Sequence, residues 1–173
     1  INVISVCRLV PQKNIFYILE IAKKIPDVTF SIIGDGPLWS EIKNFILKNK
    51  LKNVNLLGKK ERIYDYLYNS DIYLSTSLYE GLPISILEAM SIGLPIIASR
   101  VTGNCDTIVH GKSGYLYDLM NIENAIGYIN KLSRNKKLRI DMGNLAYKRQ
   151  RELFSKRLMI LKYSDLYLKQ LIK

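Results

Sequence analysis

Two basic residues stand where an apolar run gives way to a helical pattern. Arg8 and Lys13 bound a short loop that ends just before the helical pattern begins at Ile15. A helix N-terminus already favours an anion through its free N–H groups and its dipole, so two cations beside it could grip a diphosphate. Two solvated cations in a basic chain are the alternative, and the pair alone does not decide between the two.

Two acidic residues surround a second junction of the same kind. Glu80 ends the loop, Gly81 allows a ligand close to the backbone, and Pro83 suits a first helical turn. Glu88 follows about a turn and a half into the helix. Carboxylates accept hydrogen bonds from vicinal hydroxyls, so the pair could hold a sugar and a ribose with phosphates between them. In the alternative, Glu80 caps the helix and Glu88 pairs with a lysine.

Short strand patterns alternate with helical patterns, which is typical of βα units around a parallel sheet. The sequence predicts strands over residues 2–6, 28–33, 54–58, 72–75 and 95–98, and near 115–116. It predicts helices over about 15–25, 37–48, 62–68 and 83–92, a weaker unit around 108, and mostly helical sequence from about 121. The expected fold is α/β: a doubly wound, Rossmann-like, mostly parallel sheet with helices on both faces.

In such a sheet, ligands bind at the carboxyl ends of the strands beside a topological switch point. The loop after residue 6 carries Arg8 and Lys13, and the loop after residue 75 carries Glu80 and leads into the helix with Glu88. The loop after residue 33 reads Gly34-Asp35-Gly36-Pro37, a tight turn. No Gly-x-Gly-x-x-Gly fingerprint follows the first or second strand, and no Gly-x-x-x-x-Gly-Lys-Ser/Thr loop is present. Dehydrogenase and P-loop functions therefore lose their main support.

Composition excludes several classes of protein. The chain has 173 residues, of which 48% are hydrophobic and 24% charged, so disordered, collagen-like and low-complexity classes can be dropped. Lys and Arg total 26 against 15 Asp and Glu, a net charge of +11. Nucleic acid, an anionic membrane face and a phosphorylated small molecule are the candidate partners. No apolar run approaches the roughly 18 residues of a membrane-spanning helix.

The cysteines and the start of the chain bear on location. Cys7 and Cys105 form no Cys-x-x-Cys pattern and favour free thiols in a reducing cytosol. No secretory signal is visible, and a start almost directly in a strand suggests excision from a longer chain. No clear metal-ligand cluster is visible, and His110 stands in a predicted turn as a surface residue. We expect a cytoplasmic protein.

An ordered set of motifs carries a resemblance to a known family. In chain order the motifs are Arg8 with Lys13, Gly34-Asp35-Gly36-Pro37, residues 54–58, Ser70-Asp71-Ile72, Glu80 with Glu88, and residues 93–98 and 111–116. The set covers roughly residues 1–120 and is far more specific than any of its members. The chain resembles the C-terminal, donor-binding half of group 1 glycosyltransferases, which have the GT-B fold.

The resemblance implies a role for each candidate residue. Arg8 and Lys13 would bind the donor diphosphate, and Glu80 would be catalytic at the transferred sugar. Gly81, Leu82 and Pro83 would offer backbone contacts to sugar and phosphate. Glu88 would bind the ribose, and Gly58 with Lys59 would lie at the base. Such enzymes retain anomeric configuration and use a nucleotide diphosphate sugar without a metal or other cofactor. Fixed positive groups would stabilise the leaving diphosphate instead.

The resemblance also describes the protein as a whole. Residues 1–173 would form one nucleotide-sugar-binding domain with a helical tail from about 121, and an N-terminal acceptor domain would be absent, so that this fragment alone would be inactive. The whole enzyme would transfer a hexose to a cell-surface glycan such as capsule or lipopolysaccharide. Cys7 and Cys105 depart from the family, because they replace a glycine and a basic residue in predicted cleft loops.

Two other functions stay open at this point. A sugar-nucleotide epimerase of the same architecture would bind a diphosphate here, although it would need more acid–base residues around the sugar. A nucleic-acid-binding module would explain the charge of +11, yet no zinc pattern, RNP-like motif or basic recognition helix is visible, and we expect no nucleic-acid partner.

The basic tail suggests an amphipathic terminal helix with several leucines, namely Leu153, Leu158, Leu161, Leu168 and Leu171. The helix would pack on the sheet or reach the absent domain. In the alternative it would make a peripheral contact with the anionic cytoplasmic face of a membrane.

Overall fold

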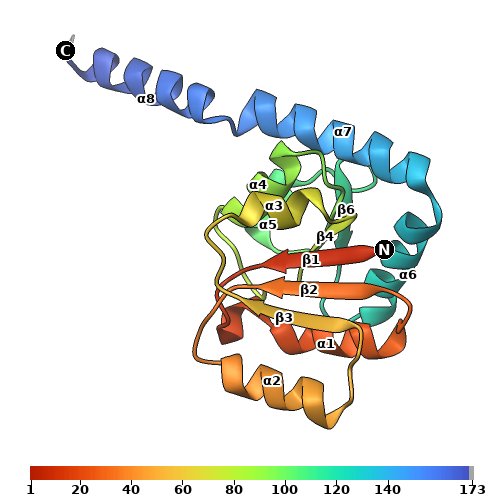
Figure 1. The fold of residues 1–173 in the computed structure, drawn as a ribbon. Coiled ribbons are helices and arrows are strands. Elements are labelled where there is room, and N and C mark those ends of the chain that lie inside the picture. The colour runs from red at the N-terminus through yellow and green to blue at the C-terminus, as the bar shows by residue number, and fades with distance from the viewer. Residues whose placement is uncertain (172–173) are drawn as a thin grey trace.

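The computed structural model describes residues 1–171 and is built around a six-stranded sheet (Figure 1). The strands are β1 (Asn2–Val6), β2 (Thr29–Ile33), β3 (Val54–Gly58), β4 (Ile72–Ser75), β5 (Ile96–Ser99) and β6 (Gly114–Tyr117). Neighbouring strands pair in parallel in the order β3-β2-β1-β4-β5-β6. The strand order reverses between β1 and β4, and such a switch point opens a crevice beyond the carboxyl ends of the two strands.

Helices cover both faces of the sheet (Figure 1). Helices α1 (Ile15–Lys24), α2 (Trp39–Lys48) and α6 (Ile122–Arg134) share one buried cluster with the sheet, and α3 (Ile63–Tyr68) and α4 (Ile84–Ser91) share the other. The long helix α7 (Lys136–Leu153) contributes to both clusters. A short 3-10 turn, η1 (Pro11–Lys13), precedes α1, a short helix, α5 (Thr102–Thr107), follows β5, and α8 (Lys156–Leu171) comes last.

The two clusters arise from the alternation of side chains along the strands. In β1, Val3 packs into the cluster with α1 and Ile4 packs into the cluster with α4, because successive strand residues point to opposite faces. Strands covered on both faces are mostly apolar, which explains the short runs of β-branched residues in the sequence. The predicted doubly wound α/β fold is confirmed, and the described sheet is parallel throughout.

Some element boundaries differ from the prediction. Helix α2 begins at Trp39 rather than at Pro37, because Pro37 and Leu38 form the turn that leads into it. The weak unit predicted around residue 108 is α5, which ends at Thr107. Its sequence, Thr-Gly-Asn-Cys-Asp-Thr, has no apolar period, and buried polar groups fix it instead. The predicted helical tail corresponds to α6, α7 and α8.

Helix α8 extends beyond the body of the domain (Figure 1). Tyr163, Leu166 and Leu168 are each more than half exposed, so the interpretation that the terminal helix packs on the sheet is wrong. The physical reason is that its apolar residues fall in two short runs, 158–161 and 166–168, which Lys162, Ser164 and Asp165 interrupt, so they form no single stripe along the helix. Leu153 ends α7 rather than joining α8, and the side chain of Leu171 lies outside the described part. No helix within residues 1–171 combines the length and apolar content needed to cross a membrane.

Candidate functional site

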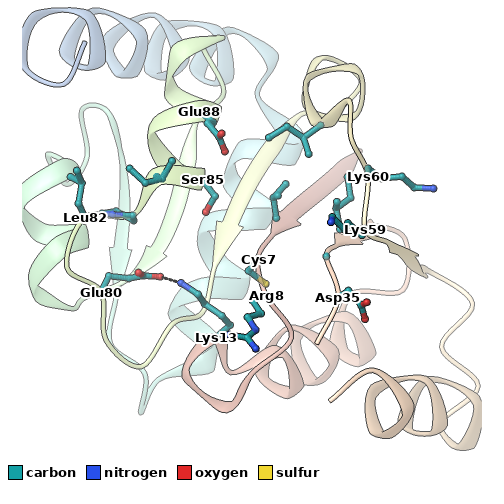
Figure 2. Close-up of a pocket in the computed structure, with 16 residues that line it drawn as sticks. Cys7, Arg8, Lys13, Asp35, Lys59, Lys60, Glu80, Leu82, Ser85 and Glu88 are labelled. Carbon is teal, nitrogen blue, oxygen red and sulfur yellow. Dashed lines mark hydrogen bonds and ion pairs between the residues drawn. The ribbon is translucent and has the colours of Figure 1, made fainter. Parts of the chain in front are cut away.

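A cleft of about 550 Å³ lies at the switch point of the sheet (Figure 2). Three loops and one helix bring most of the predicted site residues to the lining of this cleft. These residues are Arg8, Lys13, Lys59, Glu80, Leu82, Pro83 and Glu88. Gly58 and Gly81 adjoin these residues in the chain but do not line the cleft themselves. The structure thus brings both charged pairs to one cavity.

Two glycines fix the course of the loop that carries Arg8. Gly34 has a φ of +139°, and a Cβ there would lie 1.8 Å from the carbonyl oxygen of Cys7. A Cβ on Gly36 would lie 2.5 Å from the carbonyl oxygen of Leu9. Because only glycine fits at such an approach, the turn after β2 supports the loop after β1 and holds Arg8 at the cleft.

Lys13 ends the short turn η1, one residue before Asn14, whose left-handed φ of 48° leads the chain into α1. The Lys13 ammonium lies 2.5 Å from Oε1 of Glu80, and the two side chains are only 20% and 10% exposed. Water screens the Coulombic attraction within so shielded a pair less than it does in a surface pair of the same geometry. Arg8 forms no ion pair with the described residues and lies exposed at the cleft.

Glu80 does not cap α4. That helix begins at Ile84, and its N-cap residue, Pro83, makes no side-chain capping hydrogen bond. The capping alternative is therefore wrong, because the Glu80 carboxylate is turned toward Lys13 (Figure 2). Residues 82–85 line the cleft, so the first turn of α4 is open to it and provides a place for an anion.

Glu88 lies inside α4, and its side chain also lines the cleft (Figure 2). Partial burial raises the pKa of its carboxyl above the ordinary value. Among residues 1–171 it has no ion-pair partner, so the alternative that it pairs with a lysine is wrong. A half-buried carboxylate without a charged partner is suited to accept hydrogen bonds from the hydroxyls of a ligand.

The connection from β3 to α3 forms another wall of the cleft. Lys59 and Lys60 line it together with the apolar side chain of Ile63. The Lys60 ammonium lies 5.6 Å from the centre of the Tyr66 ring, within reach of a cation–π interaction. Gly58, with a φ of +73°, turns the chain into this wall. Lys59 is exposed and is free to meet a ligand.

Several polar residues of the site are not found by sequence reasoning. Asp35 and Ser85 line the cleft, and Ser77 donates a hydrogen bond to Glu80. The place of Asp35 two residues after the end of a strand is a usable signal, although the surrounding glycines and proline also fit a plain turn. Nothing in the sequence distinguishes Ser77 from a solvated loop serine or Ser85 from a solvated helix serine.

The two cysteines have different surroundings. Burial raises the pKa of the Cys7 thiol to about 12, and the nearby Lys13 only partly offsets that effect. Cys105 is exposed on α5. His110 is exposed and does not line the cleft, as predicted, and it accepts a hydrogen bond from the Leu116 backbone N–H at Nδ1. Within residues 1–171, no three His, Cys, Asp or Glu side chains gather as metal ligands.

A doubly wound parallel sheet with cations and a helix N-terminus at its switch point is typical of proteins that bind phosphorylated nucleotides. Residues 1–149 match the family described as glycosyl transferases group 1, and the chain belongs to that family. The resemblance seen in the motifs is thereby confirmed, and family membership favours a transferase over the epimerase and nucleic-acid alternatives.

Proteins that are similar to this chain support its place in this family. The chain is 38% identical over 149 residues to a UDP-Gal:alpha-D-GlcNAc-diphosphoundecaprenol alpha-1,3-galactosyltransferase of Escherichia coli, a match that covers 82% of this chain. A crystal structure of an S. aureus TarM mutant with fondaparinux, alpha-GlcNAc-glycerol and UDP superposes with a TM-score of 0.90 and 31% identity over 96% of the chain. The pneumococcal O-GlcNAc transferase GtfA, in complex with UDP and GlcNAc, superposes over 99% of the chain with a TM-score of 0.86 and 26% identity.

The chain spans only part of each relative. It covers 38% of the E. coli galactosyltransferase, 35% of the TarM chain and 36% of the GtfA chain. The matched portion corresponds to one half of the GT-B architecture. Activity, acceptor and partners of the whole protein therefore enter only as proposals.

Proposed function

We propose that this chain is the donor-binding half of a retaining glycosyltransferase and that its donor is a UDP-sugar. The observation that supports this most is the convergence of two cations, a helix N-terminus and two carboxylates on one cleft. Cations and N–H groups complement a diphosphate, and carboxylates complement sugar hydroxyls. UDP in the TarM and GtfA structures supports uridine as the nucleoside.

The basic residues act on the diphosphate. Arg8, exposed and without an anionic partner among residues 1–171, has its guanidinium donors available for phosphate oxygens. Lys13, from the same connection between β1 and α1, and the first turn of α4 add further positive charge. Charge that develops on the departing diphosphate is then met by groups already in place, which is how such sites lower a barrier. We propose that transfer needs no metal for this reason.

Each of the remaining groups binds a different part of the donor. Glu80 is the catalytic residue that contacts the transferred sugar, with the backbone of Gly81, Leu82 and Pro83 beside sugar and phosphate. Glu88 binds the ribose. Gly58 and Lys59 lie next to the base. The placement of Lys59 and Glu88 on separate walls of one cleft supports this order along the donor.

The rest of the enzyme supplies the acceptor. We propose that residues 1–173 are one donor domain, that an acceptor domain completes the active cleft, and that the isolated chain binds donor without transferring sugar. A cell-surface glycan assembled at the cytoplasmic side of a membrane is the proposed product. The diphosphoundecaprenol substrate named for the E. coli relative supports a membrane-linked acceptor.

Calorimetry of the 173-residue chain with UDP, ADP and several UDP-sugars tests the proposal. We expect UDP and at least one UDP-sugar to bind with a Kd at or below the millimolar range, about −4 kcal/mol or better. Arg8→Ala should weaken UDP binding at least about tenfold, because hydrogen bonds to charged groups contribute roughly 1.5–3 kcal/mol. Arg157→Ala, on α8 and outside the cleft, is the matched control and should bind normally.

Absence of binding by every nucleotide at millimolar concentration would contradict the proposal. Steeply salt-dependent binding of DNA or RNA by the same chain would instead support the nucleic-acid alternative.

A further inference from the structure

The Glu80 carboxylate receives two donors on one oxygen. Oε1 accepts from the Lys13 ammonium at 2.5 Å and from the Ser77 hydroxyl at 2.7 Å. The second oxygen, Oε2, accepts no hydrogen bond from residues 1–171. The carboxylate is therefore anchored through one oxygen and keeps the other for a ligand.

Ser77 is buried and is held by hydrogen bonds within the protein. Ser77 is only 2% exposed, and its carbonyl accepts a 2.6 Å hydrogen bond from the hydroxyl of Ser99, which is fully buried. The Ser75 hydroxyl lies 3.3 Å from the Ser77 hydroxyl. Since the single proton of Ser77 goes to Glu80, Ser75 donates to Ser77, and a short relay of hydroxyls ends on the carboxylate.

The segment before Glu80 is also fastened to the loop that carries Lys13. The Thr76 hydroxyl donates to the Lys13 carbonyl at 2.8 Å, and the Leu78 N–H donates to the Gln12 carbonyl at 2.8 Å. The Gln12 side-chain amide donates in turn to the Tyr79 carbonyl at 2.8 Å. These contacts join the β1–α1 and β4–α4 loops, so that Ser77 has a fixed place from which to orient the carboxylate.

We propose that Ser77 is a positioning residue for sugar recognition: its hydroxyl holds Oε1 of Glu80 so that Oε2 faces the hydroxyls of the donor sugar. The inference rests on the proposed function, because it takes Glu80 as the residue that contacts the sugar. Lys13 alone cannot serve as well, since a bound diphosphate competes for its ammonium. The neutral hydroxyl of Ser77 has no such competing partner and keeps the carboxylate in place when the donor is bound.

The test compares UDP with the preferred UDP-sugar by calorimetry, so that the ratio of the two dissociation constants reports the contribution of the sugar. We expect Ser77→Ala to bind UDP as the wild type does. Its dissociation constant for the UDP-sugar should be about tenfold higher than that of the wild type. Ser77→Thr keeps a hydroxyl and should restore most of the lost affinity. Ser133→Ala removes a buried serine hydroxyl on α6 that has no hydrogen-bond partner within residues 1–171, and should change neither constant.

A double-mutant cycle shows whether Ser77 acts through Glu80. If it does, Ser77→Ala should have no further effect on sugar affinity in a Glu80→Gln background. Additive losses in the double variant would overturn the inference, as would a Ser77→Ala protein that loses UDP and UDP-sugar affinity in equal proportion. Thermal unfolding of each variant checks that the fold is retained.

Failure of the proposed function has a different result. If the wild type binds no uridine nucleotide, the donor site itself is wrong. If the wild type binds UDP but gains nothing from any attached sugar, the donor site stands and the role of Ser77 is overturned.

Discussion

The two carboxylates of the cleft differ in what holds them. Glu80 is 10% exposed and accepts hydrogen bonds from Lys13 and Ser77, whereas Glu88 stands on α4 without an ion-pair partner among residues 1–171. Burial raises the pKa of Glu88 because no cation offsets the loss of water. A carboxylate whose charge is balanced by donors of the protein is fixed in position. A carboxylate without such donors is stabilised more by a ligand that donates hydrogen bonds to it. The sugar end of the cleft is thus preorganised, and the ribose end is completed by its ligand.

The largest effect should come from disturbing the loop at the sugar end. Gly103 of α5 donates its N–H to the Glu80 carbonyl at 3.1 Å, and a Cβ on Gly103 would lie 2.0 Å from the Gly81 carbonyl oxygen. Gly103→Ala must push that loop aside, and we expect a loss of about 3 kcal/mol in the free energy of unfolding, as for overpacked sites. Urea denaturation measures it.

Gly127→Ala is the matched control for that substitution. Gly127 is exposed within α6, and nothing lies within 4 Å of a Cβ placed there. The change should stabilise the domain by up to about 1 kcal/mol through helix propensity. Equal stability of the two alanine variants would show that the tight contact at Gly103 does not hold the loop.

At the ribose end, Glu88→Gln should change the stability of the ligand-free protein and its affinity for UDP in opposite directions. Removing an uncompensated charge should raise the free energy of unfolding of the ligand-free protein at pH 7, because the amide has no charge to desolvate. The same variant should bind UDP at least about tenfold more weakly if Glu88 accepts hydrogen bonds from the ribose. Chemical denaturation and calorimetry on one preparation measure both. A variant that is less stable and binds UDP normally would contradict the role assigned to Glu88.

The pH dependence follows from the raised pKa of Glu88. The folded protein binds a proton more tightly at this site than the unfolded chain does, so this group's contribution to stability is fully present below the unfolded pKa of about 4.3 and is lost as the pH rises through the raised folded value. Glu88→Gln should remove that part of the pH dependence. UDP-sugar affinity should show the opposite trend and weaken as the pH falls and Glu88 becomes protonated. Unfolding and binding series from pH 4 to pH 7 test both slopes, and parallel wild-type and variant curves would contradict the assignment.

The smallest effect concerns Cys7, which lies in the cleft near Lys13 and Glu80. With a pKa of about 12, its thiol carries almost no thiolate at pH 8, whereas Cys105 is exposed. A thiol-specific reagent should therefore modify Cys105 rapidly and Cys7 slowly, with UDP changing the rate at Cys105 little. Mass spectrometry of the labelled peptides measures the two rates. Rapid labelling of Cys7 would show that the cleft is more open than the burial of this thiol indicates.

The sequence predicts the fold well because its strong signals are local. Alternating strand and helix patterns, turn glycines and Pro83 determine where the elements begin and end, and the switch point follows from their order. The charged pairs at the ends of β1 and β4 can be found in the same way. Helix α5 is harder to predict, because Asn104 and Thr107 stabilise it through buried hydrogen bonds rather than through an apolar stripe.

Tertiary contacts decide the features that the sequence does not show. The separation between Lys13 and Glu80 is 67 residues, and their pairing depends on the adjacency of β1 and β4. Ser77 becomes a buried donor only because Ser99 and the Lys13 loop close around it. The exposure of α8 depends on which surfaces the domain offers to its apolar residues, because these residues form no stripe that would specify one face of the helix.

The most direct test is a comparison of UDP and UDP-sugar binding by the wild type, Glu80→Gln and Glu88→Gln. The division of the donor between the two carboxylates predicts that Glu88→Gln loses affinity for both ligands by a similar factor. Glu80→Gln should bind UDP at least as tightly as the wild type, because the Lys13 ammonium loses a competing anion, and should lose only the affinity that the sugar adds. Loss of UDP affinity in Glu80→Gln together with normal UDP binding in Glu88→Gln would contradict the assignment of the sugar and ribose ends.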